Sequence, residues 1–371
     1  MCYFLWMTDD TDPLLDALVD LIPNLLGAMD AVEQVQRNMH PPWLTQFADF
    51  VRPVENRLQA SARDFLKLTF PEHLQAFKNQ LDQGITYALR ACDGITQQAE
   101  TPDNLGQFMK AMRAGCRAQE LVYPIASVMK PVNQYYLEAP VRQNEALLQS
   151  LMIGASKDQV GILNAENERS QRGGFSLYVP ENKGPDEPMA LVVALHGGTG
   201  HGSDFLWSWL REARSRGFMV LAPTAVTDTW SLMDEDHDLP NLLRMLDYVR
   251  AHWSLDEAHI LLTGMSDGAT YSLLAGLRAD SPFTHLAPFS GVLHPGISMT
   301  GDMAHAKDKP IYLVHGTLDW MFPVETAQMA AMALERAGAN LTYREIDNLS
   351  HTYARSENPG LIEWFCPALT I

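Results

Sequence analysis

The stretch that most constrains this chain is residues 259–271, which read HILLTGMSDGATY. An apolar run typical of a buried strand ends at Gly264, Ser266 follows between two glycines, and a helical run of small residues starts at once. So tight a turn forces Ser266 into a strained backbone conformation and holds its hydroxyl clear of the sheet. A side chain at Gly264 or Gly268 would collide with the neighbouring strand or helix. The pattern is that of the G-x-S-x-G nucleophile elbow, and it predicts a nucleophilic serine.

Two later loops provide the acid and the base that a serine hydroxyl needs to become a nucleophile. Residues 311–314 read as a buried strand with Asp319 beyond its end, and His351 lies in the loop after the last apolar strand. The order serine, acid, histidine, each after a strand, is that of the α/β-hydrolases. Asp347 competes as the acid because it is close to His351 in sequence. An acid on the preceding strand's exit reaches the imidazole from the side opposite Ser266, which favours Asp319.

A glycine-rich loop predicts a site for the negative charge that develops on a carbonyl oxygen. Residues 190–195 read as a buried strand that runs into 196–200, HGGTG, where missing side chains leave backbone N–H groups free to face a ligand. The oxyanion donors are predicted at Asp267, which follows the nucleophile, and at Gly198 or Thr199. By itself the loop is equally typical of an ordinary glycine-rich strand exit, and the elbow downstream favours the oxyanion hole.

From about Ser156 to its end the chain resembles serine esterases of the α/β-hydrolase superfamily. Residues 255–268 are similar to polyhydroxybutyrate-depolymerase-like and feruloyl-esterase-like members. The resemblance covers a little over half of the chain. It implies Ser266 as nucleophile, Asp319 as acid, His351 as base, and hydrolysis of a small-molecule carboxylic ester through an acyl-enzyme, with neither a metal nor an organic cofactor. Thioesterases and peptidases share this superfamily, and a catalytically inactive hydrolase fold used for binding is the alternative of another class.

The sequence divides into two parts of different composition. Residues 1–155 predict an all-helical domain, with one helix interrupted near Pro23 and a last helix over roughly 133–153. Residues 156–371 predict the catalytic domain, with a hairpin followed by alternating strands and helices that require a mostly parallel sheet. Three roles suit the helical domain: stabilising or oligomerising the enzyme, capping the active site, or binding a partner.

Composition excludes several classes of protein. The net charge of −18 and pI near 5.0 oppose binding to nucleic acid or to an anionic membrane surface. No apolar run is long enough for a membrane span, and the apolar residues 2–7 are too few and lack the basic flank of a secretory signal. Four scattered cysteines without metal spacing predict reduced thiols and a cytoplasmic location.

Two other features near the predicted site need an interpretation. The acidic run 234–238 has the oxygen atoms of a calcium site, but it lacks the spacing and glycine of a calcium loop and directly precedes a helix, which favours a helix-capping loop. Trp230 precedes that run and Trp320 follows Asp319. Both tryptophans are candidates for substrate contact, and a local packing anchor is the alternative for each.

Overall fold

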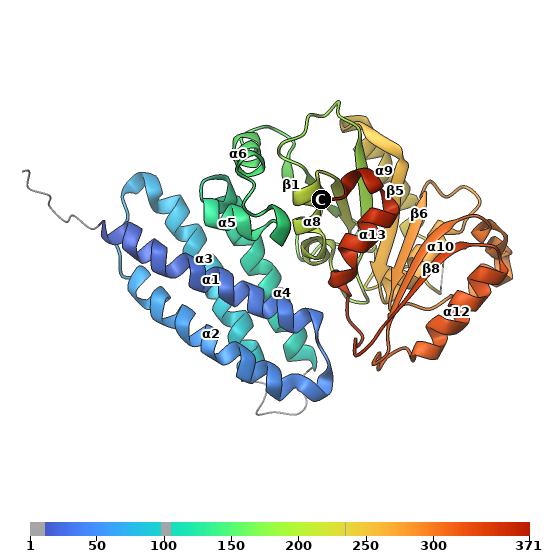
Figure 1. Cartoon of the computed structure of the whole chain (residues 1–371), viewed down its shortest axis with the longest axis horizontal. Coiled ribbons are helices and arrows are strands. Elements are labelled where there is room, and N and C mark those ends of the chain that lie inside the picture. Colours follow the sequence, from blue (N-terminus) through green and yellow to red (C-terminus); the bar gives the residue numbers. More distant parts are fainter. Residues whose placement is uncertain (1–11, 98–104, 234) are drawn as a thin grey trace, which may run out of the picture. The chain divides into compact units, whose positions relative to one another are not determined.

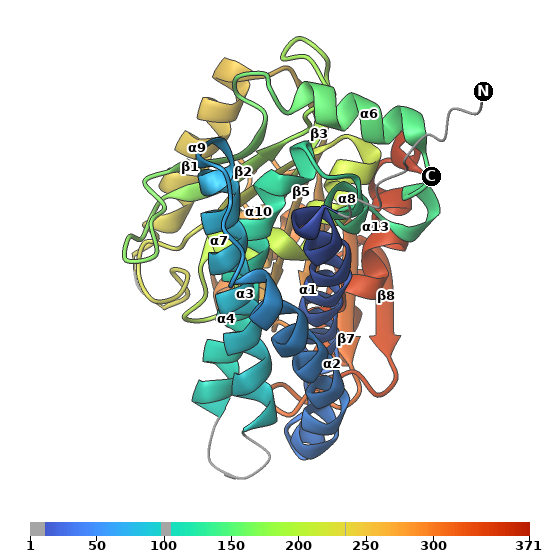
Figure 2. The same ribbon diagram turned by 90° about the vertical axis from the view of Figure 1, so that its left-hand side faces the viewer.

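The computed structural model describes residues 12–97, 105–233 and 235–371. The short apolar run 2–7 lies outside these ranges, as does residue 234 of the acidic run. The chain forms two compact units, Met1–Val35 with Pro41–Ile125 and Gln36–His40 with Ala126–Ile371. The first unit is helical and the second contains the sheet (Figures 1 and 2). Helices α5 (Lys130–Tyr135) and α6 (Glu145–Gly154), which lie before the expected domain boundary at residue 155, fall in the second unit.

The first unit contains four long helices. They are α1 (Pro13–Arg37), α2 (Leu44–Phe65), α3 (Gln75–Thr96) and α4 (Leu105–Val122). Their shared core is made of apolar residues at helical spacing, among them Leu21, Leu25, Val32, Val51, Leu58, Leu81, Ile85 and Cys92. One buried polar contact joins two of the helices, because Thr96 Oγ1 donates to Glu55 Oε2 at 2.9 Å.

Helix α1 continues through Pro23, so the expected interruption was wrong. A proline inside a helix leaves the carbonyl four residues earlier without its donor. Here that carbonyl belongs to Val19, a residue that is 66% exposed, so water can donate a hydrogen bond to it. Leu21, Ile22 and Leu25 are buried around the proline, and their packing stabilises the helix across it.

The helix expected over 133–153 is also two helices, α5 and α6. Helix α5 ends at Tyr135, and Pro140, which has no backbone N–H to donate, lies in a separate 3-10 turn at Ala139–Val141. Asn144 then caps α6, since its side-chain oxygen accepts from the backbone N–H of Leu147 at 3.1 Å. Both residues are breaker and start signals that the apolar spacing concealed.

The second unit is built on one eight-stranded sheet in the order β1-β2-β4-β3-β5-β6-β7-β8. The strands are β1 (Gly161–Ala165), β2 (Phe175–Val179), β3 (Met189–Leu195), β4 (Met219–Pro223), β5 (Leu255–Met265), β6 (His285–Phe289), β7 (Pro310–Gly316) and β8 (Asn340–Ile346). β1 pairs antiparallel with β2 and β2 with β4, and the other neighbours pair in parallel. The predicted hairpin and mostly parallel sheet are confirmed.

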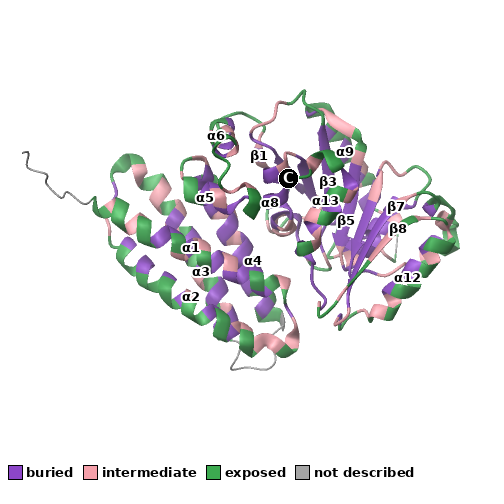
Figure 3. Cartoon of the chain, in the orientation of Figure 1, coloured by how far each residue is buried: buried purple, intermediate pink, exposed green. Residues whose placement is uncertain are grey.

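Helices pack around this sheet as its apolar strands require, because a parallel sheet is stable only with both faces covered. They are α7 (Gly202–Phe205), α8 (Leu210–Arg216), α9 (Asp238–His252), α10 (Asp267–Gly276), α11 (Pro295–Thr300), α12 (Val324–Arg336) and α13 (Asn358–Phe365). Strands β3 and β4 are buried along their length, whereas α12 exposes its outer side (Figure 3). Since the strands from β3 to β8 are parallel, the loops after them meet at one edge of the sheet.

Candidate active site

Ser266 lies in the tight turn between β5 and α10, with φ 57° and ψ −118°. A non-glycine residue adopts such a backbone only where the surroundings enforce it. The flanking glycines explain how the turn fits. A Cβ at Gly264 would lie 2.5 Å from the backbone of Gly268, and a Cβ at Gly268 would lie 2.5 Å from the carbonyl oxygen of Leu195. A side chain at either glycine would therefore collide with neighbouring backbone, as the elbow predicts.

The imidazole of His351 lies between Ser266 and Asp319. Its Nε2 is 3.0 Å from Ser266 Oγ, and its Nδ1 is 2.8 Å from Asp319 Oδ2. With the proton on Nδ1 donated to the carboxylate, Nε2 is left to accept from the serine hydroxyl. All three residues are buried, at 7–8% exposure. The structure thus brings together the three residues that the sequence singled out, from the loops after β5, β7 and β8.

Asp319 is held by more than the imidazole. Its Oδ1 accepts from the backbone N–H groups of Met321 at 2.9 Å and Phe322 at 2.8 Å. Burial alone raises the pKa of this carboxyl, but the hydrogen bonds from His351 and Phe322 outweigh it, so the pKa of Asp319 lies below its ordinary value. The rival acid Asp347 is exposed to solvent.

His315 supports the acid loop from inside the sheet. It is fully buried, its Nε2 lies 2.8 Å from Phe322 O, and the same nitrogen is 3.4 Å from Asp319 Oδ2. The place of His315 on the strand before Asp319 indicates support of the sheet or of the acid loop, and these contacts agree with that interpretation.

The loop of residues 196–200, here called the glycine loop, lies against the nucleophile. A Cβ at Gly197 would lie 3.5 Å from the Cβ of Ser266. Asp267 is the first residue of α10, and the first amides of a helix have no partner within it. The amide of Thr199 is already used, because it donates to Asp228 O at 2.8 Å. Of the two candidates in the glycine loop, Gly198 is therefore the one whose amide remains a candidate oxyanion donor.

The two tryptophans occupy different environments. Trp230 is 2% exposed, stacks on Tyr271 at 5.5 Å and donates its indole N–H to His196 O at 2.7 Å. The expected substrate contact of Trp230 is not what this packing provides, because its ring is a local anchor. Trp320 is 44% exposed, and its ring centroid is 6.2 Å from that of His351. It stays a candidate for substrate contact.

His196 and His201 hold the glycine loop at its two ends. Ala225 N–H donates to His196 Nε2 at 3.1 Å, so Nδ1 carries the proton and donates to Gly197 O at 2.7 Å. Burial lowers the pKa of His196 to about 3, and the ring is neutral at ordinary pH. His201 caps α7, with its Nδ1 accepting from Ser203 N–H at 3.3 Å.

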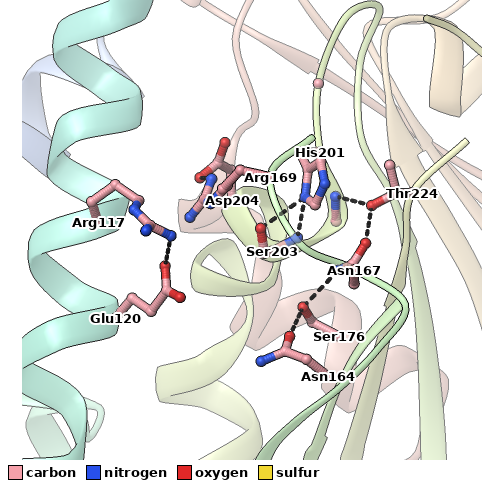
Figure 4. A network of polar contacts seen from close by, with 12 residues as sticks. Arg117, Glu120, Asn164, Asn167, Arg169, Ser176, His201, Ser203, Asp204 and Thr224 are labelled. Atoms are coloured by element: carbon pink, nitrogen blue, oxygen red, sulfur yellow. Dashed lines mark hydrogen bonds and ion pairs between the residues drawn. The ribbon is translucent and has the colours of Figure 1, made fainter. Parts of the chain in front are cut away.

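A chain of polar side chains anchors the end of the glycine loop to the first two strands (Figure 4). Gly202 N–H donates to Thr224 Oγ1 at 2.9 Å, and Thr224 Oγ1 donates to Asn167 Oδ1 at 2.6 Å. Asn167 Nδ2 donates in turn to Ser176 Oγ at 2.9 Å, and Ser176 Oγ to Asn164 Oδ1 at 2.6 Å. Each member is satisfied by the next, which fixes the loop rigidly.

Two aspartates of the acidic run, Asp236 and Asp238, accept hydrogen bonds from backbone N–H groups. Asp236 Oδ1 accepts from Leu239 N–H at 3.0 Å, at the start of α9, and Tyr271 donates to the same oxygen at 2.5 Å. In the part of the chain that the structure describes, no group of three or more His, Cys, Asp or Glu residues could hold a metal ion. The helix-capping interpretation fits these contacts.

Two further expectations from the sequence concern the cysteines and a membrane span. Cys92, Cys116 and Cys366 are buried thiols, and burial is the main reason why the pKa of Cys92 rises to about 12. Among the described residues no helix is both long and apolar enough to span a bilayer.

Part of the chain is similar in sequence to known esterases. Residues 232–359 match the family model described as Phospholipase/Carboxylesterase. A bifunctional acetylxylan esterase/xylanase, XynS20E, of Neocallimastix patriciarum is 28% identical over 159 residues, which cover 41% of this chain and 22% of that protein. The chain thus spans about a fifth of the length of this curated relative.

Solved structures of esterases are similar at a lower level. A thermostable esterase has 21% identity and a TM-score of 0.45, covering 56% of this chain and 62% of its own. The fluorophosphonate-binding serine hydrolase FphF of Staphylococcus aureus has 15% identity and a TM-score of 0.46, covering 57% and 98%. The C-terminal part of the chain has the sheet and the elbow of an α/β-hydrolase fold, and residues 232–359 within it match the Phospholipase/Carboxylesterase family model.

Proposed function

We propose that the protein is a serine carboxylesterase in which Ser266, His351 and Asp319 form the catalytic triad. The observation that carries the proposal is the unbroken hydrogen-bonded series from Ser266 Oγ through the imidazole to the Asp319 carboxylate, with distances of 3.0 and 2.8 Å. Side chains from three separate loops meet in the geometry that nucleophilic catalysis requires. The family match of this region to carboxylesterases supports ester hydrolysis as the reaction.

In the proposed mechanism Ser266 Oγ attacks the ester carbonyl while His351 Nε2 takes its proton. Asp319 holds the imidazole with Nδ1 protonated and stabilises the positive charge that the ring acquires. Collapse of the tetrahedral intermediate breaks the bond to the alcohol, which leaves with the proton from His351 Nε2. Water then attacks the acyl-enzyme with the same base, and the carboxylic acid departs. The steps as written use no metal and no organic cofactor.

In this proposal the backbone amides of Asp267 and Gly198 stabilise the negative charge of each tetrahedral intermediate. The Asp267 amide is supported by its place at the start of α10, where the helix dipole also favours negative charge. The Gly198 amide is supported by the contact of the glycine loop with Ser266 and by the use of the Thr199 amide elsewhere. Such preorganised donors commonly contribute about 3 kcal/mol each to lowering the barrier.

The substrate class is proposed from two features. Trp320 is exposed, and its ring lies 6.2 Å from that of His351, the residue that returns the proton to the leaving alcohol, so the proposal assigns its indole to contact with the alcohol group. An aromatic face of this kind packs well against a sugar or an aromatic ring. The acetylxylan esterase named above acts on a carbohydrate ester by its name, and short acyl esters of a ring-containing alcohol are therefore the proposed substrates.

The test is hydrolysis of p-nitrophenyl esters from acetyl to palmitoyl by the whole chain and by Ser266→Ala. We expect the substitution to lower turnover by on the order of a millionfold, because the nucleophile is lost. Ser272→Ala is the matched control, since Ser272 is buried in α10, the helix that follows Ser266, and donates to Ala269 O at 2.7 Å.

A fluorophosphonate should label the wild-type protein and not Ser266→Ala. Retained activity in Ser266→Ala would contradict the mechanism, and absence of both hydrolysis and labelling would favour a catalytically inactive binding protein. A matched ester, thioester and anilide then separates an esterase from a thioesterase or a peptidase, and faster cleavage of either of the latter two would correct the substrate class.

A further inference from the structure

Residues 226–231, here called the 226–231 loop, lie between β4 and α9 and form hydrogen bonds with the glycine loop. Three consecutive residues of this loop form hydrogen bonds with the glycine loop or with Asp267, the residue after Ser266. Thr199 N–H donates to Asp228 O at 2.8 Å, Thr229 Oγ1 donates to Asp267 Oδ2 at 2.5 Å, and Trp230 Nε1 donates to His196 O at 2.7 Å. The loop therefore contacts both segments that carry the proposed oxyanion donors.

The 226–231 loop is itself closed by one buried carboxylate. Asp238 is 1% exposed, and its Oδ1 accepts from Val226 N–H at 2.8 Å. Its Oδ2 accepts from both the backbone N–H and the hydroxyl of Ser231, each at 2.8 Å. Because the two ends of the loop bind the same carboxylate, the atoms between them are fixed relative to the start of α9.

Arg172, from the turn between β1 and β2, joins this loop to the glycine loop. Its Nη1 donates to Gly200 O at 2.7 Å, while its Nε lies 2.8 Å from Thr227 O and 3.1 Å from Ala225 O. One rigid guanidinium thus binds carbonyl groups of both loops. A lysine ammonium lacks this planar arrangement of donors and could not reproduce all of the contacts.

The glycine loop needs such support because its conformation is strained. Residues 197–200 form a tight turn in which Gly200 N–H donates to Gly197 O at 2.9 Å. Thr199 has φ 56°, in the left-handed region that a β-branched residue rarely adopts. Such strain persists only where surrounding bonds over-determine the backbone. The bond from Thr199 N–H to Asp228 O fixes the peptide that follows Gly198.

We propose that Arg172 and the 226–231 loop position the oxyanion hole, by fixing the glycine loop so that the Gly198 amide faces the carbonyl oxygen of the substrate. The inference rests on the proposed function, since it presupposes attack by Ser266. Arg172 touches no reacting atom and is a positioning residue. Its loss should therefore weaken stabilisation of the transition state and leave binding of the ground-state ester almost unchanged.

The experiment compares Arg172→Gln and Arg172→Lys with Arg250→Gln, whose parent side chain pairs with Glu257 on the surface. We expect kcat to fall about 10- to 100-fold in both Arg172 variants, with KM changed less than about twofold, because removal of a donor itself costs about 100- to 1000-fold. The inhibition constant of a trifluoromethyl ketone, whose adduct with Ser266 places an oxyanion in the hole, should rise by the factor by which kcat/KM falls. Arg250→Gln should match the wild type.

A second variant keeps the inference testable if the Arg172 variants do not fold. Thr229→Val removes the hydroxyl that binds Asp267 and preserves the volume, and Thr300→Val is its control, since the Thr300 hydroxyl donates locally to Asp302 at the exposed end of α11. A selective loss of kcat and of ketone affinity is expected for Thr229→Val alone.

Two other sets of results would contradict the positioning role or the proposed function. Normal kcat in the folded variants, or reduced kcat with unchanged ketone affinity, would overturn the positioning role while leaving the triad intact. Wild-type protein that neither hydrolyses esters nor reacts with a fluorophosphonate would overturn the proposed function and this inference with it.

Discussion

At the scale of the residue, Asp319 divides its two oxygens between two tasks. Oδ1 binds two backbone amides of its own loop and Oδ2 binds His351, so the carboxylate cannot rotate without breaking three hydrogen bonds. These bonds keep the pKa below its ordinary value despite burial. A carboxyl with a lowered pKa stays ionised at every pH above its ordinary value and is neutralised only below it, so it remains charged wherever His351 needs a partner.

Replacing Asp319 by Asn should lower kcat by about 1000- to 10,000-fold, because an amide favours the wrong tautomer of the imidazole. Asp347→Asn is the matched control, since Asp347 is exposed and lies in the loop that carries His351. The measurement is kcat on p-nitrophenyl acetate for both variants. If Asp347→Asn lost the activity and Asp319→Asn kept it, the assignment of the acid would be reversed.

The same scale shows what the sequence could and could not predict about the site. The elbow at Ser266 was predictable because its glycines and its strand lie within a few residues of it. The availability of the Thr199 amide was not, because its partner Asp228 lies in another loop and nothing near position 199 indicates that contact. Arg172 was equally hidden, since it reads as one polar residue of a hairpin turn.

At the scale of the element, local spacing predicted strands and helices well and their breaks less well. Pro23 did not interrupt α1, because buried neighbours stabilise the helix across it, whereas Pro140 and Asn144 divided the helix expected over 133–153. Whether a proline breaks a helix depends on the packing that surrounds it, and this packing is decided by residues distant in sequence. The alternation of strands and helices after residue 156 is a longer signal, and it gave the sheet correctly.

Two glycines in helices make a matched pair at this scale. A Cβ at Gly154, the last residue of α6, would lie 1.9 Å from Glu181 O, whereas a Cβ at Gly27 in α1 would have nothing within 4 Å. Gly27→Ala should therefore stabilise its unit by about 0.5–1 kcal/mol, because alanine favours the helix. Gly154→Ala should destabilise the second unit, since a backbone segment must move.

Urea unfolding of the two variants beside the wild type measures both effects. A stabilised Gly154→Ala would show that α6 does not approach the backbone of Glu181 as closely as described.

At the scale of the whole molecule, two effects of acidification oppose each other. Lowering the pH protonates carboxylates and so reduces the mutual repulsion of a chain with a net charge of −18. It also destabilises the folded state through His196, whose pKa is lowered to about 3 by burial. The unfolded chain can bind a proton at this histidine and the folded chain cannot. A histidine with a depressed pKa destabilises the fold as the pH falls below its unfolded pKa of about 6.5.

His196→Gln should therefore lessen the loss of stability on acidification. Glutamine retains one donor and one acceptor for the bonds to Gly197 O and Ala225 N–H, but it does not titrate. Between pH 7 and pH 5 the wild type should lose about 2 kcal/mol more of its free energy of unfolding than this variant, from the proton that only the unfolded histidine binds. Urea titrations at the two pH values test the difference, and His237→Gln, at an exposed position of the same unit, should behave as the wild type. Because the carboxylates are common to all three proteins, their effect cancels in the comparison. Parallel losses in His196→Gln and the wild type would mean that His196 is protonated in the folded protein, and the neutral tautomer that donates to Gly197 O would then be wrong.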